Sequence, residues 1–190
     1  MKNSKKDAGT AYHEAGHVVV SWCLGVEVIR ATIVPDNDSS GHVIIEPEMP
    51  STSDAIDRWH PYRLYAEKLV MVRLAGDVAQ RRYNSYSVRH QHSQNDRKSC
   101  YDILCVFAAD EKKLDVKPHY EMLRNWTAHL IEQNWHLVKA VAKALLDCPV
   151  LFSALVLDAI RAANQKQTGI DVQVLLDVLE AIRSQDAHTE

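Results

Sequence analysis

The sequence predicts a mainly helical α+β domain that contains one small β-hairpin. Three observations lead to this fold class. Glycine and proline are scarce, with six of each in 190 residues, so we expect few turns and long elements. Beyond residue 61, apolar residues recur mostly at helical spacings of three and four. Only the segments 28–34 and 42–46 are short runs rich in β-branched residues and bounded by turn-forming residues.

The first helix is expected to begin near residues 7–10, with Thr10 as its N-cap, and to end at Gly25. A strand over 28–34 follows. The run Pro-Asp-Asn-Asp-Ser-Ser-Gly then forms a turn, because these residue types favour tight turns, and a return strand covers 42–46. These segments make the hairpin.

The rest of the chain is predicted to be helical after a loop over 47–53. A helix opened by Pro61 carries an apolar stripe as far as Ala79, and the polar stretch 84–94 ends it. A new helix starts near 93–95. Further helices are expected over about 118–147, which Pro149 ends, and over 153–164 and 171–184.

The composition is that of one globular domain over residues 1–190, with 165–190 as a helical extension. A hydrophobic fraction of 46% with 25% charged residues excludes disordered and fibrous classes. The net charge of −3 offers no basic surface for nucleic acid. The longest apolar stretches are far shorter than the ~20 residues of a membrane span. We therefore expect neither a nucleic-acid partner nor a membrane span.

The four cysteines predict a reducing compartment. They form no C-x-x-C pair, and no secretory signal precedes them. Such cysteines are typically reduced thiols, mostly buried, in a cytoplasmic protein. The cysteines are Cys23, Cys100, Cys105 and Cys148.

The segment His13-Glu-Ala-Gly-His17 matches the pattern H-E-x-x-H. Residues i and i+4 share one face of a helix, so both imidazoles can reach one metal ion, and neutral imidazole suits Zn²⁺. Glu14 is close enough to accept a proton from water at that metal, as a general base does. Chance supplies the three residues about 0.03 times in such a chain. The pattern predicts a zinc site with Glu14 as the catalytic residue.

A third ligand is needed, and the residues narrow the choice. The extended pattern H-E-x-x-H-x-x-G-x-x-H is excluded, because Val20 and Cys23 stand where it requires glycine and histidine. Cys23 lies on another side of the helix from His13 and is predicted to be a core residue. Glu67, on the next helix, and Asp96, at the start of a later one, are the remaining candidates.

The segments around this motif resemble the peptidase domain of the FtsH-type ATP-dependent zinc metalloproteases. Thr-Ala-Tyr-His-Glu-Ala-Gly-His-Val at 10–18 and Ala-Thr-Ile-Val-Pro at 31–35 are similar to that family. Later landmarks follow in order, and the similarity covers about 10–162. They are Leu-Ala-Gly-Asp-Val-Ala-Gln at 74–80, Ser-Gln-Asn-Asp at 93–96, Leu-Ile-Glu-Gln-Asn-Trp at 130–135 and Val-Ala-Lys-Ala-Leu-Leu-Asp at 141–147.

The resemblance implies a zincin-like metallopeptidase fold and a zinc cofactor. Carried over residue by residue, it makes His13, His17 and Asp96 the metal ligands and Glu14 the catalytic base. The substrate would be an unfolded polypeptide or a peptide. The family's small β element also implies an edge that accepts an extended chain, here within 28–34 or 42–46.

The sequence also departs from that family. These 190 residues contain no G-x-x-x-x-G-K-[ST] loop, which implies an ATP-independent peptidase. The alternatives are a catalytically weak or inactive zinc-binding adaptor or regulatory module, and a hydrolase of non-peptide amides. A homo-oligomer or a separate partner protein is compatible with each. Gln80 replaces the family's glutamate and His92 its usual glycine, and both His90 and His92 are candidates to bind metal or stabilise an oxyanion.

Overall fold

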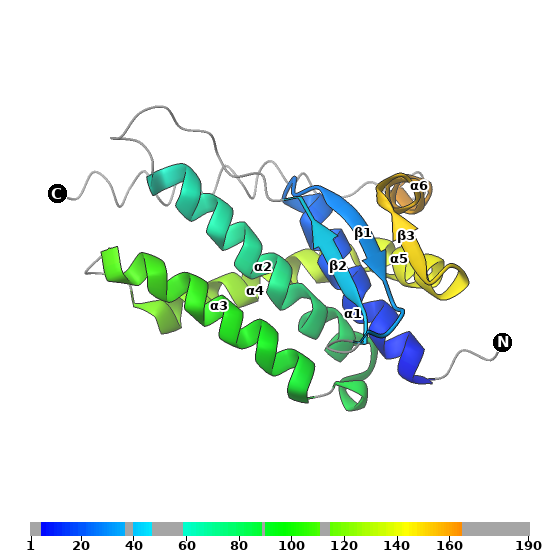
Figure 1. Ribbon diagram of the computed structural model, residues 1–190, viewed down its shortest axis with the longest axis horizontal. Helices are drawn as coiled ribbons and strands as arrows, with labels where there is room; N and C mark the ends of the chain where they lie inside the picture. The colour runs from blue at the N-terminus through cyan, green and yellow to red at the C-terminus, as the bar shows by residue number, and fades with distance from the viewer. Residues whose placement is uncertain (1–4, 37–39, 47–58, 89, 111–114, 165–190) are drawn as a thin grey trace.

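The computed structural model describes residues 5–36, 40–46, 59–88, 90–110 and 115–164, and every structural statement below concerns them. Helices dominate, and a small sheet lies over the first helix (Figure 1). This confirms the mainly helical α+β class. The elements are α1 (Lys5–Cys23), β1 (Val28–Thr32), β2 (His42–Ile45), α2 (Trp59–Asn84), the 3-10 helix η1 (Ser85–Ser87), α3 (His90–Asp110), α4 (Val116–Gln133), α5 (Trp135–Asp147), β3 (Val150–Phe152) and α6 (Ser153–Asn164).

Helix α1 runs through the core and packs mainly against α2 and α5. Its second half buries three consecutive valines, Val18–Val20, completely. Gly16 allows the close approach of α2, since a Cβ there would lie 2.4 Å from the carbonyl oxygen of Ala75. Gly25 ends the helix region with φ +68°, a conformation that glycine adopts without strain. The helix therefore holds the H-E-x-x-H segment at the centre of the molecule.

The predicted N-cap of this helix is wrong. Helix α1 begins at Lys5, so Thr10 lies in its second turn. The residues before Thr10 include one glycine but no proline, and the helix extends through them. The predicted end near Gly25 agrees with the structure.

The sheet has three antiparallel strands in the order β2-β1-β3. Ala31 of β1 faces Val43 of β2 and Leu151 of β3 across the two ladders. The sequence predicted only β1 and β2, because the three residues of β3 are too few to show alternation. As a consequence β1 is the central strand, and β2 is one of the two edge strands of the sheet. The expectation that 28–34 could offer a free edge is therefore wrong.

The long helix predicted over 118–147 is two helices, α4 and α5, that meet at Asn134. The backbone N–H and the side-chain amide of Asn134 both donate to the carbonyl oxygen of Leu130 at 3.0 Å. The carbonyl oxygen of Asn134 then accepts from Leu137 and Val138, which starts α5. Only Asn134 separates the two helices, so the spacing of apolar residues continues almost unchanged across the break. The periodicity therefore did not reveal it.

Some further expectations are also settled by the described residues. The helix over 93–108 is present as α3 but begins earlier, at His90. Cys23 and Cys100 are buried, whereas Cys105 and Cys148 are exposed, so the prediction of mostly buried thiols is wrong for two of them. None of the helices in the described ranges has the length and hydropathy needed to cross a membrane. The loop 47–53, the helix 171–184 and the extension 165–190 lie outside the described residues.

Candidate metal centre

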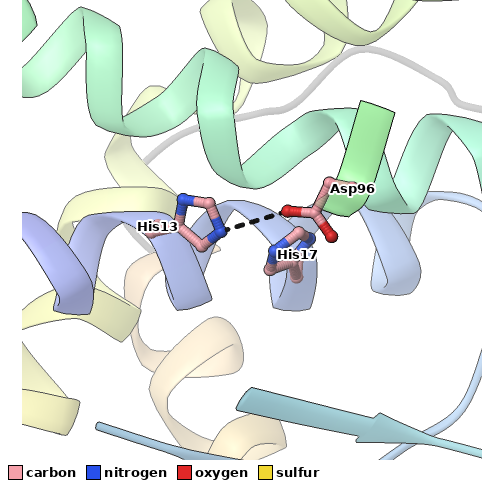
Figure 2. A group of neighbouring side chains, drawn as sticks. All are labelled: His13, His17 and Asp96. Carbon is pink, nitrogen blue, oxygen red and sulfur yellow. Dashed lines mark ion pairs between the residues drawn. The ribbon is translucent and has the colours of Figure 1, made fainter. Parts of the chain in front are cut away.

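Three side chains lie close together, and they come from two helices that are far apart in the sequence. His13 and His17 project from α1, and Asp96 projects from the first half of α3 (Figure 2). Each offers one ligand atom, and these atoms all lie within 4.8 Å of one another. Ligand atoms that share one tetrahedral zinc ion are about 3.4 Å apart. The three side chains would therefore need to move only slightly closer together to bind one ion. The donor set fits zinc.

Hydrogen bonds to α2 orient both imidazoles. His17 Nδ1 donates to the carbonyl oxygen of Val72 at 2.7 Å, and His13 Nδ1 donates to Oε1 of Gln80 at 3.1 Å. With Nδ1 engaged in this way, the Nε2 atom of each ring is available as a metal ligand. On its metal-facing side, His13 Nε2 lies 3.6 Å from Asp96 Oδ2. The two rings meet edge to face, with centroids 4.8 Å apart.

The backbone of α2 lines the same point. A Cβ added to Gly76 would lie 2.4 Å from His17 Nε2 and 2.5 Å from His13 Nε2. Only glycine leaves room for the two ligand atoms here. The sequence placed Gly76 within a family-like segment but gave it no role. A glycine inside a strongly helical stripe is the signal that could have suggested a close approach.

Glu14 is buried beside this cluster, with 4% of its surface exposed. Burial raises the pKa of its carboxyl to about 7, an effect that His13 opposes and Asp96 reinforces. The turn before β2 comes close to it, because a Cβ on Gly41 would lie 2.9 Å from Glu14 Oε1. A carboxyl that titrates near neutral pH suits a group that accepts and returns a proton.

The three clustered groups shift one another's protonation. Burial lowers the pKa of His17 and keeps its ring neutral. Burial also acts to lower the pKa of His13, but the close carboxylate of Asp96 and the charge of Glu14 outweigh it and raise that pKa. The pKa of Asp96 is lowered, since its contacts with the histidines outweigh its burial. Asp96 is thus an anionic ligand, and a cation that binds here competes with protons for His13.

An ion-pair cluster around one buried carboxylate connects α3 to α2 beside Asp96. The carboxylate of Asp77 on α2, 7% exposed, accepts from Arg81 Nε at 2.8 Å and from Arg97 at 3.5 Å. Arg97 directly follows Asp96, so this cluster helps to hold the turn of α3 that carries the carboxylate ligand. Sequence spacing does not reveal this cluster, because its partners are close only once α2 and α3 pack together.

The other candidates lie elsewhere. Glu67 is buried between α2 and α4, where its Oε1 lies 3.0 Å from His119 Nε2 and 3.1 Å from Arg63 Nε. It is not among the clustered ligand atoms of the described residues. Cys23 is buried in the core, as predicted. The side chains of His90 and His92 lie outside the described residues.

Comparison with known proteins finds a short and distant similarity. Over 80 residues, the chain is 31% identical to ATP-dependent zinc metalloprotease YME1L1 of Rattus norvegicus, Mus musculus and Homo sapiens. The match covers 41% of this chain and spans about a tenth of the length of these curated relatives. No family model matches the chain. Part of the chain is therefore distantly similar to a zinc metalloprotease.

Proposed function

We propose that the protein is a zinc-dependent metallopeptidase that hydrolyses peptide bonds in unfolded polypeptides or peptides. The observation that carries this proposal is the meeting of His13, His17 and Asp96 beside the buried carboxyl of Glu14. Three protein ligands leave one position of a tetrahedral ion open, which is typical of catalytic rather than structural zinc sites. The distant similarity to a zinc metalloprotease supports the same reading.

The residues of this chain would divide the work as follows. His13 and His17 would hold the metal through Nε2, and Asp96 would supply a negative ligand that offsets its charge. When bound, zinc supplies Lewis acidity, which polarises a carbonyl group and makes water more acidic. The carboxylate of Glu14 would accept a proton from the attacking water and pass it to the nitrogen of the leaving amine.

The position of β2 suggests how a substrate would bind. This strand lies at an edge of the sheet, and the turn before it, at Gly41, approaches Glu14. An extended polypeptide that paired with β2 would run past the catalytic carboxyl. Main-chain pairing accepts many sequences, because the backbone supplies most of the contacts. A folded protein would have no free strand to offer.

The second candidate function is that of a zinc-binding adaptor or regulatory module. The relatives are named as ATP-dependent proteases, and the similarity spans about a tenth of their length. A zinc-binding adaptor or regulatory module with little turnover would use the same fold and the same ligands. Unlike a peptidase, such a module would show no peptide hydrolysis, so removing the catalytic base would leave its activity unchanged.

Glu14→Gln separates the two functions, since it keeps the shape of the side chain but removes its basicity. The peptidase proposal expects one zinc per chain in wild type and variant, by elemental analysis, and a fall of ~10²–10⁴-fold in hydrolysis of labelled casein. Zinc in both proteins with no hydrolysis in either favours the adaptor. A chain that binds no zinc contradicts both functions.

A further inference from the structure

Gln80 joins the candidate metal centre to the 3-10 helix that follows α2. Its side-chain Oε1 accepts from His13 Nδ1 at 3.1 Å. Its Nε2 donates to the carbonyl oxygen of Ser87 at 2.9 Å and contacts the Ser87 hydroxyl oxygen at 3.3 Å. One amide group therefore bridges α1 and η1 from its position on α2.

The polarity of these hydrogen bonds determines which way the amide points. The carbonyl oxygen of Ser87 can only accept, so the NH₂ end of Gln80 must face it. The amide oxygen then faces His13, and Nδ1 of that ring must carry the proton. The other nitrogen, Nε2, lies 3.6 Å from Asp96 Oδ2 and is the atom left to bind a metal.

The surroundings hold both ends of this bridge in place. The Ser87 hydroxyl donates to the carbonyl oxygen of Asn84 at 2.7 Å, and the Asn84 side chain accepts from Tyr86 N at 3.1 Å. On the other side, Gly9 of α1 packs closely, since a Cβ there would lie 3.3 Å from Gln80 Nε2. Turning the amide over would place its oxygen against the carbonyl oxygen of Ser87.

We propose that Gln80 is a positioning residue of the metal centre: held by the Ser87 carbonyl, its amide oxygen keeps the proton of His13 on Nδ1 and so presents Nε2 to the metal. This proposal rests on the metal centre of the proposed function, but not on hydrolysis. It also explains why an amide occupies the position. A carboxylate could accept from His13, but its other oxygen would face the Ser87 carbonyl, and two acceptors at that distance repel.

Two substitutions separate positioning from a merely structural bridge. Gln80→Leu removes both contacts, whereas Gln80→Glu keeps the acceptor for His13 and loses only the donor to Ser87. Zinc affinity is measured by competition with a chromophoric chelator, and the melting temperature is measured on the zinc-free proteins. We expect Gln80→Leu to bind zinc ~10–100-fold more weakly, as for other partners of ligating histidines. Gln80→Glu should bind at least as tightly as wild type, although both variants melt earlier.

Ser87→Ala is the matched control for loosening η1, because it removes the 3.3 Å contact and the hydroxyl's hydrogen bond to Asn84 but keeps the carbonyl that accepts from Gln80. Its zinc affinity should equal that of wild type. Equal weakening in Gln80→Leu and Gln80→Glu would show that the amide only ties η1 to α2, and would overturn the proposal. So would a Gln80→Leu variant that binds zinc as tightly as wild type.

A spectroscopic readout tests the same point without any turnover. In the zinc-loaded wild type, NMR should show slowly exchanging Nδ1 protons for both His13 and His17. In Gln80→Leu, only the His13 proton should lose its protection, because His17 donates to Val72 instead. A wild type that shows this pattern and cleaves no peptide refutes the peptidase but keeps the role of Gln80. A wild type whose His13 Nδ1 is unprotonated with zinc bound refutes that role.

Discussion

Gly76 lies so close to His17 that a Cβ on the glycine would stand 2.4 Å from the Nε2 atom of the histidine. The contact is reciprocal across the two helices. Gly16 of α1 meets the backbone of α2 at Ala75, and Gly76 of α2 meets the ligand atoms of α1. The two glycines sit at the same helix interface, but they face different kinds of atoms. Substitutions at them should therefore fail in different ways.

Gly76→Ala should lose zinc and keep its fold. The new Cβ meets the ends of two histidine side chains, which can rotate away, and alanine is a better helix former than glycine by about 1 kcal/mol. We expect a melting temperature close to that of zinc-free wild type, together with little or no bound zinc. Elemental analysis and thermal unfolding followed by circular dichroism measure the two quantities. Stoichiometric zinc in this variant would contradict the placement of α2 against the metal centre.

Gly16→Ala should instead lose stability. Its Cβ meets the carbonyl oxygen of Ala75 at 2.4 Å and the Cβ of Ala79 at 2.7 Å, and backbone cannot move aside as a side chain can. Helices α1 and α2 would have to separate, at a cost of typically 1–3 kcal/mol for overpacking. Urea unfolding of the zinc-free protein measures this loss. An unchanged free energy of unfolding would mean that the helices are not packed this closely.

Asp96→Ala and Glu67→Ala form a second contrasting pair. Asp96 belongs to the clustered ligand atoms, so its removal should reduce zinc affinity by far more than removal of Glu67. Glu67 instead contacts Arg63 and His119, and its loss should destabilise the packing of α2 on α4 by roughly 1–3 kcal/mol. Zinc titration and urea unfolding on both variants give the comparison. Equal zinc affinities would refute Asp96 as a ligand.

The pKa of Glu14 predicts a dependence of stability on pH in the zinc-free protein. Burial raises this pKa from 4.5 to about 7, so the folded chain holds the proton more tightly than the unfolded chain. The free energy of unfolding then falls as pH rises from 4.5 through 7, by up to about 3 kcal/mol. Glu14→Gln cannot titrate there. It should be more stable than wild type at pH 8, and the difference should shrink toward pH 4.5.

Urea unfolding at a series of pH values, with chelator present, tests this. His17 and most other titrating groups remain in both proteins and largely cancel in the difference, whereas His13, whose pKa the charge of Glu14 raises, adds a smaller term of its own. Glu121→Gln is a suitable control, because Glu121 is exposed on α4, where its carboxylate lies 3.4 Å from Arg124 Nη1. A stability difference between Glu14→Gln and wild type that does not vary with pH would contradict the buried position of Glu14.

The edge position of β2 predicts a preference for unfolded substrates. A small disulfide-bonded protein should resist cleavage in its native form and be cut after reduction and alkylation, because only the unfolded chain can add a strand to the sheet. Gel electrophoresis over time follows both forms. Similar rates of cleavage for the two forms would argue against strand addition as the binding mode.

The sequence predicted the parts of the site that depend on local geometry. His13 and His17 share a face because they are four residues apart on one helix. Asp96 is about 80 residues away, and only the family resemblance selected it over Glu67. The contacts of Gly76 and Gln80 were not predictable from spacing, since they depend on how α2 crosses α1.

The same limit applies to the fold. Helical periodicity located most helices, but it missed the break at Asn134, where side-chain and backbone bonds to Leu130 replace a loop. It also missed β3, which becomes a strand through pairing with β1 rather than through its own three-residue pattern. Both features are set by tertiary contacts.

Because the candidate ligands come from α1 and α3, a bound ion would act as a reversible cross-link between positions about 80 residues apart. An ion that stays bound in the unfolded chain restricts its conformations. An ion that binds only the folded chain stabilises the folded state by mass action. The resistance of the chain to heat and to proteolysis would then follow the free zinc concentration of its surroundings. Metal supply would set the lifetime of the protein as well as its chemistry.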